Sequence, residues 1–376
     1  MPEAISFNDI PAALRIPGVY IEFDNSLANS AQPAFKLLLI GQRLSGGSVA
    51  EGEPVRVTSA GQAEDYFGRG SMLAEMIIAA KAANQWLDTW AIGLDEDGAG
   101  AAATGDITIT GSATQTGTLA LYIAGKQVNV GVTVGDDATA IGDAIAAAVN
   151  ADTSLPVTAA NVAGVVTFTA RWAGETGNDI DIRVNYYGEQ TPKGITVAIT
   201  DMTGGTTNPD VSTAIAAMGE EWYNWLVCPF SDTANLTALE TELDSRWGPM
   251  RQIGCRAFTA FRGNHADTTT HGDSRNNPHV TCMGTNIAPQ PPYIWAAINA
   301  VVAGYALSID PARPLQTLQL TGVMAPALNL RWTDSERNLL LFDGIASYKV
   351  GADGSVMIER QVTMYQENAA GLPDNS

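Results

Sequence analysis

The residues best suited to metal or acid–base chemistry are concentrated in one short segment. All three histidines fall within 15 residues, together with two aspartates and a nearby cysteine: His265, His271, His279, Asp267, Asp273 and Cys282. Transition metals prefer such imidazole, carboxylate and thiolate ligands. The spacing, however, matches neither one helix face nor a zinc pattern, and Thr, Asn, Gly and Ser fill the gaps. We expect a polar loop between two strands. A hydrolase or metal-dependent enzyme using these histidines is the alternative.

Two other kinds of site are indicated only weakly. The chain has no Gly-x-Ser-x-Gly sequence, the local motif of a hydrolase nucleophile. Residues 68–71, Gly-Arg-Gly-Ser, have the composition of an anion-binding turn but lack the spacing of a nucleotide-binding loop. We therefore expect Ser71 to begin a helix, and we predict no enzyme activity, no cofactor and no bound metal.

The three cysteines, Cys228, Cys255 and Cys282, are isolated from one another. No Cys-x-x-Cys pair occurs, which excludes a zinc ribbon and a thioredoxin-like redox site. An odd, sparse set of this kind is typical of a reducing compartment, so we expect three buried free thiols.

Tryptophan offers the largest side chain for contacts, and the chain contains eight: Trp86, Trp90, Trp172, Trp222, Trp225, Trp247, Trp295 and Trp332. Most fall on the apolar face of a predicted helix or strand, which favours core packing. Trp172 lies between Arg171 and a Gly174-Glu175 turn, so we expect it to be the best candidate for a surface contact.

The composition is that of a globular protein with a strong negative charge. There are 20 basic and 40 acidic residues, a net charge of −20, and 45% of residues are hydrophobic. Nucleic acids and anionic membranes bind proteins through Lys and Arg side chains. We therefore expect neither as a partner of this acidic chain. No signal peptide is visible, and no transmembrane helix is expected because the longest apolar stretch, residues 294–307, contains Asn299 and Gly304.

Strands alternate with helices near both ends of the chain. Residues 35–40 form a continuous apolar run, as in a buried parallel strand, and residues 54–58 fit a short edge strand. Apolar residues at helical spacing follow Ser71 and predict a helix, and residues 90–92 fit the next strand. The same alternation returns after residue 208. It ends in a capping box at Thr333 and a hairpin around residues 351–354.

Residues 97–207 differ in composition, being rich in Thr, Gly and Ala. Seven strand patterns surround a single helix whose apolar stripe is Ile141, Ile145 and Val149. We predict an α/β core with a mostly parallel sheet built from two sequence segments, an inserted strand-rich α+β domain, and an extended N-terminal arm. The expected boundaries are 1–33 for the arm and linker, 34–96 and 208–365 for the core, 97–207 for the insert, and 366–376 for a flexible end.

The predicted arm is the strand-like stretch at residues 16–26. Val19, Ile21 and Phe23 alternate with Tyr20, Glu22 and Asp24, and a small polar spacer follows instead of a hairpin turn. A lone strand is unstable in water and has to pair with an existing sheet edge, in its own domain or in another subunit. The residues expected to make an inter-subunit contact are Pro17, Gly18, Val19, Tyr20, Ile21, Glu22 and Phe23.

A series of short motifs, spread in order along most of the chain, gives it a resemblance to a known protein family. They are residues 16–26, 67–73 (Phe-Gly-Arg-Gly-Ser-Met-Leu), 177–183 (Gly-Asn-Asp-Ile-Asp-Ile-Arg), 246–249 (Arg-Trp-Gly-Pro), 282–285 (Cys-Met-Gly-Thr), 309–315 (Ile-Asp-Pro-Ala-Arg-Pro-Leu), 336–341 (Glu-Arg-Asn-Leu-Leu-Leu), 358–360 (Ile-Glu-Arg) and 363–365 (Thr-Met-Tyr). As a set, they resemble the tail sheath proteins of Mu-like contractile bacteriophages.

The resemblance implies a structural virion protein that assembles in the host cytoplasm. Its expected partners are further copies of itself in stacked hexameric rings, the inner tail tube protein, the baseplate and the tail terminator. Contraction would drive the tube through the bacterial envelope, while extended arms hold neighbouring subunits together. The family's core domain carries a subtilisin-like label that concerns fold and not activity.

In one respect the chain departs from the family. The resemblance implies that the family continues beyond the hairpin with a further domain of about 100 residues, close to an ordinary domain size, which receives and donates strands between subunits. This chain stops at Ser376, so we expect a truncated form without that domain. A surface or adhesion module is a further alternative, suggested by the Thr- and Gly-rich insert.

Overall fold

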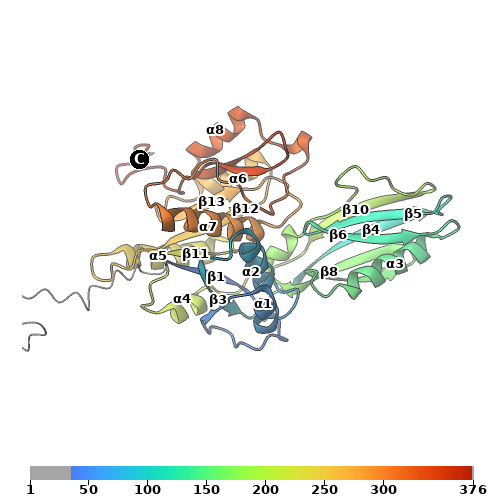
Figure 1. Ribbon diagram of the computed structural model, residues 1–376, viewed down its shortest axis with the longest axis horizontal. Helices are drawn as coiled ribbons and strands as arrows, with labels where there is room; N and C mark the ends of the chain where they lie inside the picture. Colours follow the sequence, from blue (N-terminus) through green and yellow to red (C-terminus); the bar gives the residue numbers. More distant parts are fainter. Residues whose placement is uncertain (1–34, 375–376) are drawn as a thin grey trace, which may run out of the picture. The chain divides into compact units, whose positions relative to one another are not determined.

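An eight-stranded sheet runs through the described structure, which covers residues 35–374 of a computed structural model (Figure 1). Its strand order is β15-β14-β13-β12-β11-β1-β3-β2. The strands are β1 (Lys36–Gln42), β2 (Val55–Arg56), β3 (Asp88–Leu94), β11 (Trp225–Val227), β12 (Arg256–Phe261), β13 (Val280–Gly284), β14 (Ile345–Val350) and β15 (Val356–Arg360). The predictions made for residues 1–33, including the arm residues 17–23, lie outside the described residues.

β1 explains how distant parts of the chain complete one sheet. Its apolar run is fully buried from Leu37 to Ile40, because it has a parallel neighbour on each side and a helix layer on each face. One neighbour, β3, precedes the strand-rich insert in sequence, and the other, β11, follows it. Strands from both sides of the insert therefore share one hydrogen-bonded sheet.

Both edges of this sheet are closed. β2 is only two residues long and lies antiparallel to β3. At the other edge, residues 317–320 cover the outer side of β15. The Thr317 amide donates to the Ile358 carbonyl at 2.7 Å, and the Leu320 amide donates to the Val356 carbonyl at 2.8 Å. Neither edge presents a long row of unpaired backbone groups.

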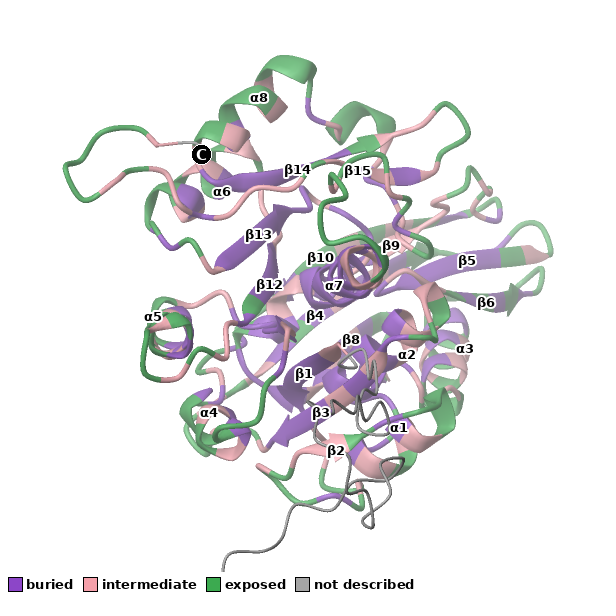
Figure 2. Ribbon diagram, turned by 60° about the vertical axis from the view of Figure 1, so that its left-hand side comes forward, coloured by how far each residue is buried: buried purple, intermediate pink, exposed green. Residues whose placement is uncertain are grey.

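Helices cover both faces of the sheet. α2 (Met72–Ala83) and α7 (Pro292–Ile309) pack together on one face, and α4 (Ser212–Met218) and α5 (Thr233–Trp247) pack together on the other (Figure 2). Ser71 begins α2 as predicted, since its hydroxyl accepts a hydrogen bond from the Ala74 amide at 3.2 Å. The predicted capping box at Thr333 is also confirmed at α8 (Asp334–Phe342). The remaining helices of the described core are α1 (Ala60–Phe67), α6 (His265–Asp273) and the 3-10 turn η2 (Leu328–Leu330).

The strand-rich insert contains two further sheets. One has the order β10-β4-β8-β7, and the other has the order β6-β5-β9. Helix α3 (Ala138–Ala151) packs against β6 and β7, and its predicted stripe of Ile141, Ile145 and Val149 is buried. The strands are β4 (Ala102–Gly111), β5 (Gly117–Ile123), β6 (Lys126–Val132), β7 (Val157–Val162), β8 (Val165–Ala173), β9 (Ile182–Val184) and β10 (Ile195–Thr203), with a 3-10 turn η1 (Glu175–Asp179).

Residues 265–273 of the histidine-rich segment form a helix, α6, and not the polar loop that we predicted; His279 lies beyond this helix. Asn264 begins it by accepting a hydrogen bond from the Asp267 amide at 3.0 Å. The hydroxyls of Thr268 and Thr270 donate to carbonyls four residues earlier, so these polar side chains are satisfied within the helix. Such local bonds do not alter the hydrophobic pattern, which is why periodicity missed this helix. The short α1 was not predicted either.

The tryptophans also depart from prediction. Trp172, expected at the surface, is only 1% exposed, whereas Trp86, Trp222 and Trp247 are largely exposed. Trp247 is the last residue of α5, beyond the reach of the sheet that covers Leu236, Leu239 and Leu243. Apolar residues at helical spacing predict which face of a helix is buried. They do not predict where along the helix the sheet that covers this face ends.

α7 is longer than the predicted apolar stretch. Among the described residues it is the one helix that is long and apolar enough to cross a membrane, and 72% of it is buried inside the protein. It packs against α2, β11 and β12. Its composition is therefore explained by its place as a core helix.

Candidate functional site

The histidine segment does not form a site. His265 Nε2 lies 3.1 Å from the Glu336 carbonyl, and His279 lies 3.6 Å from Asp244. His271 is half-buried with its ring stacked on Phe261, the ring centroids 4.3 Å apart. Each imidazole has its own surroundings, so the three do not converge.

The chemistry of this segment is also that of a protein core. Burial, with a contribution from Arg275, lowers the pKa of His271 to about 4, so the ring is neutral at physiological pH. Cys282 lies inside β13, where burial raises the pKa of its thiol to about 12. Within residues 35–374, no three His, Cys, Asp or Glu side chains are grouped to hold a metal ion.

The insert covers the Gly70 side of the turn before α2, while Gly68 and Arg69 line an open hollow of about 700 Å³. Gly70 has a φ of +77°, and a Cβ added there would lie 2.6 Å from the Thr153 carbonyl oxygen. The Ser71 side chain is buried and caps the helix. These contacts leave the Gly-Arg-Gly-Ser turn as a helix start, as predicted from the sequence.

The densest buried polar chemistry lies where the insert meets the core sheet. Glu75 on α2 is only 4% exposed in its side chain, and its Oε1 accepts from Lys126 Nζ at 2.7 Å. Lys126 begins β6 in the insert, and it also donates to the Ser154 carbonyl at 2.7 Å. The Tyr293 hydroxyl on α7 donates to Glu75 Oε2 at 3.2 Å. One carboxylate thus joins two core helices to the insert.

Two opposing effects act on the Glu75 carboxyl, and their net result is a raised pKa. Burial raises its pKa, while the Lys126 ammonium and the hydrogen bonds from Lys126 and Tyr293 lower it. A buried carboxylate without a partner is strongly destabilising. The ionised form of Glu75 therefore depends on the insert staying in place.

A second ionic contact crosses the same junction. Asp181, just before β9 of the insert, is almost fully buried and accepts from Arg183 Nη2 at 2.7 Å. Arg262, which follows β12 of the core, donates its Nη2 to the same carboxylate at 2.7 Å. Arg183 Nη2 also lies 3.5 Å from the Ile287 carbonyl of the core. These contacts hold the insert to the carboxyl end of β12.

Trp172 packs at the same junction. Its indole Nε1 donates to the Thr176 hydroxyl at 3.1 Å, and its ring meets the Tyr293 ring edge-on, with centroids 6.2 Å apart. Gln42, at the end of β1, donates to the Ala173 carbonyl at 2.5 Å. Hydrogen bonds therefore tie the central strand of the core directly to β8 of the insert.

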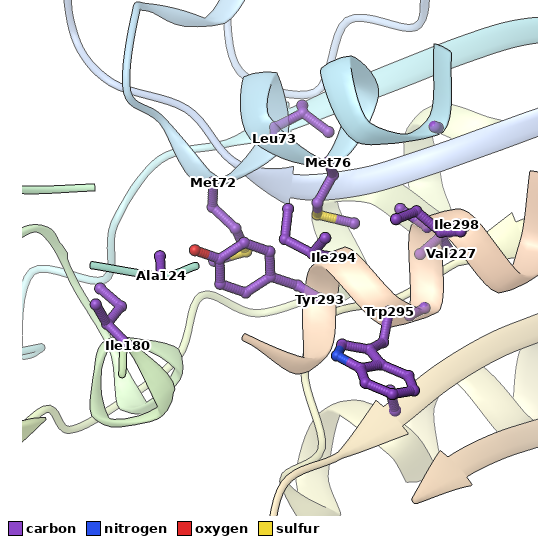
Figure 3. Packing of buried hydrophobic residues seen from close by; sticks show 14 of the residues in the cluster. Met72, Leu73, Met76, Ala124, Ile180, Val227, Tyr293, Ile294, Trp295 and Ile298 are labelled. Atoms are coloured by element: carbon purple, nitrogen blue, oxygen red, sulfur yellow. The ribbon is translucent and has the colours of Figure 1, made fainter. Parts of the chain in front are cut away.

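Apolar side chains from both parts fill the rest of the junction. Figure 3 shows Tyr293 of α7 beside Met72 of α2, with Ala124 and Ile180 of the insert on the other side. All four belong to one continuous cluster of buried residues. The junction is packed like a domain core, and unlike a hinge.

Sequence reasoning missed this junction, although it left one signal. Glu75 is a single carboxylate within the apolar run Met72-Leu-Ala-Glu-Met-Ile-Ile, and a charge on such a face needs a partner. That partner, Lys126, is 51 residues away in sequence. No local pattern identifies a pair at that separation.

Asp179, at the end of η1, predicts a pH dependence of stability. Burial raises the pKa of its carboxyl to about 7; Arg262 lowers it and Glu175 raises it further. The folded protein then holds a proton that the unfolded chain releases near pH 4, so stability falls as pH rises from about 4 to 7. We expect Asp179→Asn to increase the free energy of unfolding by about 2–4 kcal/mol at pH 8.

Urea unfolding at pH 5 and pH 8 measures this effect. The gain should fall to less than half at pH 5, because stability lost to this group accumulates between about pH 4 and pH 7 and only the first part has been lost by pH 5. The exposed Asp201→Asn substitution in β10 removes the same charge and serves as the control. An equal gain from Asp179→Asn at both pH values would contradict the assignment.

Comparison with known sequences identifies the family. Residues 98–208 match the model described as phage tail sheath protein beta-sandwich domain, and residues 204–364 match the one described as phage tail sheath protein central domain. The chain is also 46% identical to a protein named Mu-like prophage FluMu tail sheath protein, from Haemophilus influenzae. That alignment covers 99% of this chain and 77% of the relative. The chain belongs to the phage tail sheath protein family.

Solved structures give weaker similarities. A sheath tail protein from Desulfitobacterium hafniense has a TM-score of 0.45 at 12% identity, covering 94% of this chain and 77% of the other. One from Listeria innocua has a TM-score of 0.43 at 13% identity, covering 87% and 68%. A chain of the anti-feeding prophage baseplate has a TM-score of 0.43 at 13% identity, covering 94% and 69%. The family assignment does not depend on them.

Membership of this family settles the broad class of function. The chain is a structural subunit of a Mu-like phage tail sheath, a component of the virion, and not an enzyme. The resemblance stated from the sequence motifs is confirmed, and the alternative of a histidine-based enzyme has no support. The residues that matter are then those that join parts of the subunit and those that join subunits.

Proposed function

We propose that this sheath subunit polymerises around an inner tail tube and moves its core and insert together as one rigid body when the sheath contracts. The sequence match over 99% of the chain carries the first part of this proposal. The buried junction of Glu75, Lys126 and Tyr293 supports the second. We assign the core to residues 34–96 and 208–365 and the insert to residues 97–207.

The energy for contraction comes from two alternative packings between subunits. No nucleotide-binding loop occurs in the sequence, so the contracted arrangement has to be lower in free energy from the start. A small gain per subunit adds up over many stacked hexameric rings. Rigid subunits suit this mechanism because movement is then confined to the contacts between them.

Flexible connections between subunits complete the proposed mechanism. We assign this role to residues 17–23, which by their alternating pattern add a strand to a sheet of a neighbouring subunit. Backbone hydrogen bonds of this kind survive rotation at the linker that follows. The other proposed partners are the tube protein, the baseplate and the tail terminator, met during assembly in the host cytoplasm.

Deletion of residues 1–30 tests this proposal. We expect the intact chain to form helical tubes in electron micrographs when mixed with tail tubes, and the deleted chain to form none. Both proteins should show the same circular dichroism and melting behaviour, because the core and insert within residues 35–374 share a continuous buried cluster of their own. Tubes of normal length from the deleted chain would refute the role of the arm.

A further inference from the structure

A hollow of about 470 Å³ lies beside β9 and β10, where the insert meets the core. Its lining comes from residues 181–186 and β10 of the insert, and from Arg262, Ile287, Ala327 and Leu330 of the core. Figure 2 shows β9 and β10 side by side. We name this space the arginine hollow, because Arg183 and Arg262 both line it. A ligand bound there touches both parts of the subunit.

Two guanidinium groups of the arginine hollow share a single carboxylate. Arg183 and Arg262 each donate their Nη2 to the same oxygen, Oδ1 of Asp181, at 2.7 Å. Neither arginine forms another ion pair within residues 35–374, and neither Nη1 group has a hydrogen-bond partner there. One carboxylate balances only one of the two cations, so a positive charge and two N–H donors remain available.

The other charges around the arginine hollow do not remove this excess. Asp179 approaches Arg262 from the interior, but burial raises the pKa of its carboxyl to about 7, so it is only partly ionised at neutral pH. Asp201 is exposed on β10, where solvent screens its charge. Burial raises the pKa of Tyr186, and the nearby charge of Arg331 opposes this rise. Arg331 thus adds a further cation beside the hollow.

Both guanidinium groups are held in position by the surrounding protein. The Arg183 guanidinium lies over the Tyr186 ring, 5.9 Å from its centroid, and the Tyr186 hydroxyl donates to the Ala325 carbonyl at 2.6 Å. Arg262 Nε donates to the Ala288 carbonyl at 3.4 Å. A ligand therefore meets donors that are already oriented, and little side-chain entropy is lost on binding.

We propose that the arginine hollow binds a small oxyanion, a phosphate or carboxylate group, between the Nη1 groups of Arg183 and Arg262. Guanidinium groups bind both kinds of oxyanion through short, charge-assisted hydrogen bonds. Arg183 belongs to the insert and Arg262 to the core, so the bound anion adds a bridge across their junction. This inference goes beyond the proposed function, because a single subunit binds the anion without a tube or a second copy.

The larger hollow beside the turn before α2 does not share this excess of positive charge. Arg69 and Arg171 line it together with the carboxylates of Glu64 and Asp65. Arg69 Nε lies 3.5 Å from Glu64 Oε1, and Arg171 Nε donates to the Leu155 carbonyl at 2.7 Å. Cations and carboxylates are equal in number in that lining, so it does not favour an anion.

Thermal unfolding of the intact chain with added anions tests the proposal. The probes are sodium phosphate and sodium malonate, and sodium chloride at the same ionic strength is the reference. A ligand that binds only the folded state raises the unfolding midpoint by mass action. We expect an oxyanion at about 20 mM to raise the midpoint by about 2–5 °C above chloride, with saturation at higher concentration. A response to phosphate alone or to malonate alone identifies which group the hollow takes.

Substitution of the two arginines locates the response. In Arg183→Gln and in Arg262→Gln, Asp181 keeps one guanidinium partner, and circular dichroism checks that each variant folds. The oxyanion shift should fall below about a third of its original size in both variants. Arg313→Gln, at an exposed arginine after α7, removes the same charge and should leave the shift unchanged. Isothermal titration of the unaltered chain with phosphate and with malonate measures binding without any substitution.

Three results would overturn the proposal. One is a midpoint that responds equally to the oxyanions and to chloride, together with no heat of binding. Another is a full oxyanion shift that survives in both Arg183→Gln and Arg262→Gln. The third is a midpoint that rises with protein concentration in chloride alone, which would place an acidic side chain of a second copy in the hollow. Tube formation does not enter these measurements, so failure of the anion site leaves the proposed sheath function standing, and the reverse also holds.

Discussion

Replacing Trp172 by alanine is expected to destabilise the subunit by about 3–5 kcal/mol, the cost of removing a fully buried tryptophan side chain. The indole is 1% exposed and occupies the junction between the insert and the core. The loss includes its apolar contacts, the edge contact with Tyr293, and the hydrogen bond to Thr176, whose hydroxyl would remain buried. The two parts of the subunit should therefore loosen at this point.

Urea unfolding and limited proteolysis together measure that loss. Trp86→Ala is the matched control, because Trp86 is 75% exposed and its removal should change the free energy of unfolding by less than about 0.5 kcal/mol. In Trp172→Ala, cleavage is expected within residues 96–101 and 204–208, where the chain crosses between core and insert. A variant as stable and as resistant to protease as the Trp86 control would show that the junction is not held by this residue.

Replacing Lys126 by methionine is expected to cost about 3 kcal/mol at pH 8, because Glu75 is left buried without its cation. This value is at the low end for a buried pair because the Lys126 side chain is 41% exposed. Burial already raises the pKa of Glu75, so without Lys126 the carboxyl takes up a proton more readily. A neutral carboxyl needs no cation, and the cost should therefore shrink toward pH 4.

The double variant Glu75→Gln with Lys126→Met isolates the ionic interaction. It should recover most of the stability lost by Lys126→Met, because both charges are removed together. Lys193→Met, at an exposed lysine of the insert, controls for loss of one positive charge from the surface. A cost that is the same at pH 8 and pH 4, or that the double variant fails to recover, would contradict the assignment.

Local chemistry made most of the elements predictable. Each of these features depends only on residues that are close together in sequence. They are the apolar run of β1, the serine before α2, the aspartates before α3 and α5, and the capping box of α8. The three cysteines are also buried free thiols, as predicted from their isolation. Such features appear in a window of about ten residues, which is what sequence patterns describe.

The junction could not be predicted because its contacts join residues far apart in the chain. Gln42 meets Ala173, Glu75 meets Lys126, and Tyr293 meets both Glu75 and Trp172. The turn beside Trp172 suggested a surface position, yet that turn is the place where the insert packs against the core. The polar composition around His271 similarly concealed a helix in which threonine hydroxyls bond to carbonyls of the same segment.

The covered and short edges of the central sheet affect how newly folded subunits behave before they assemble. A protein made in many copies, with an eight-stranded sheet, would risk joining edge to edge at high concentration as soon as it folds. Here the strap of residues 317–320 occupies the outer side of β15, and β2 is too short to act as a template. Each newly made subunit is therefore inert toward sheet stacking. Association of free subunits by this route is disfavoured, and contacts between copies have to use other surfaces.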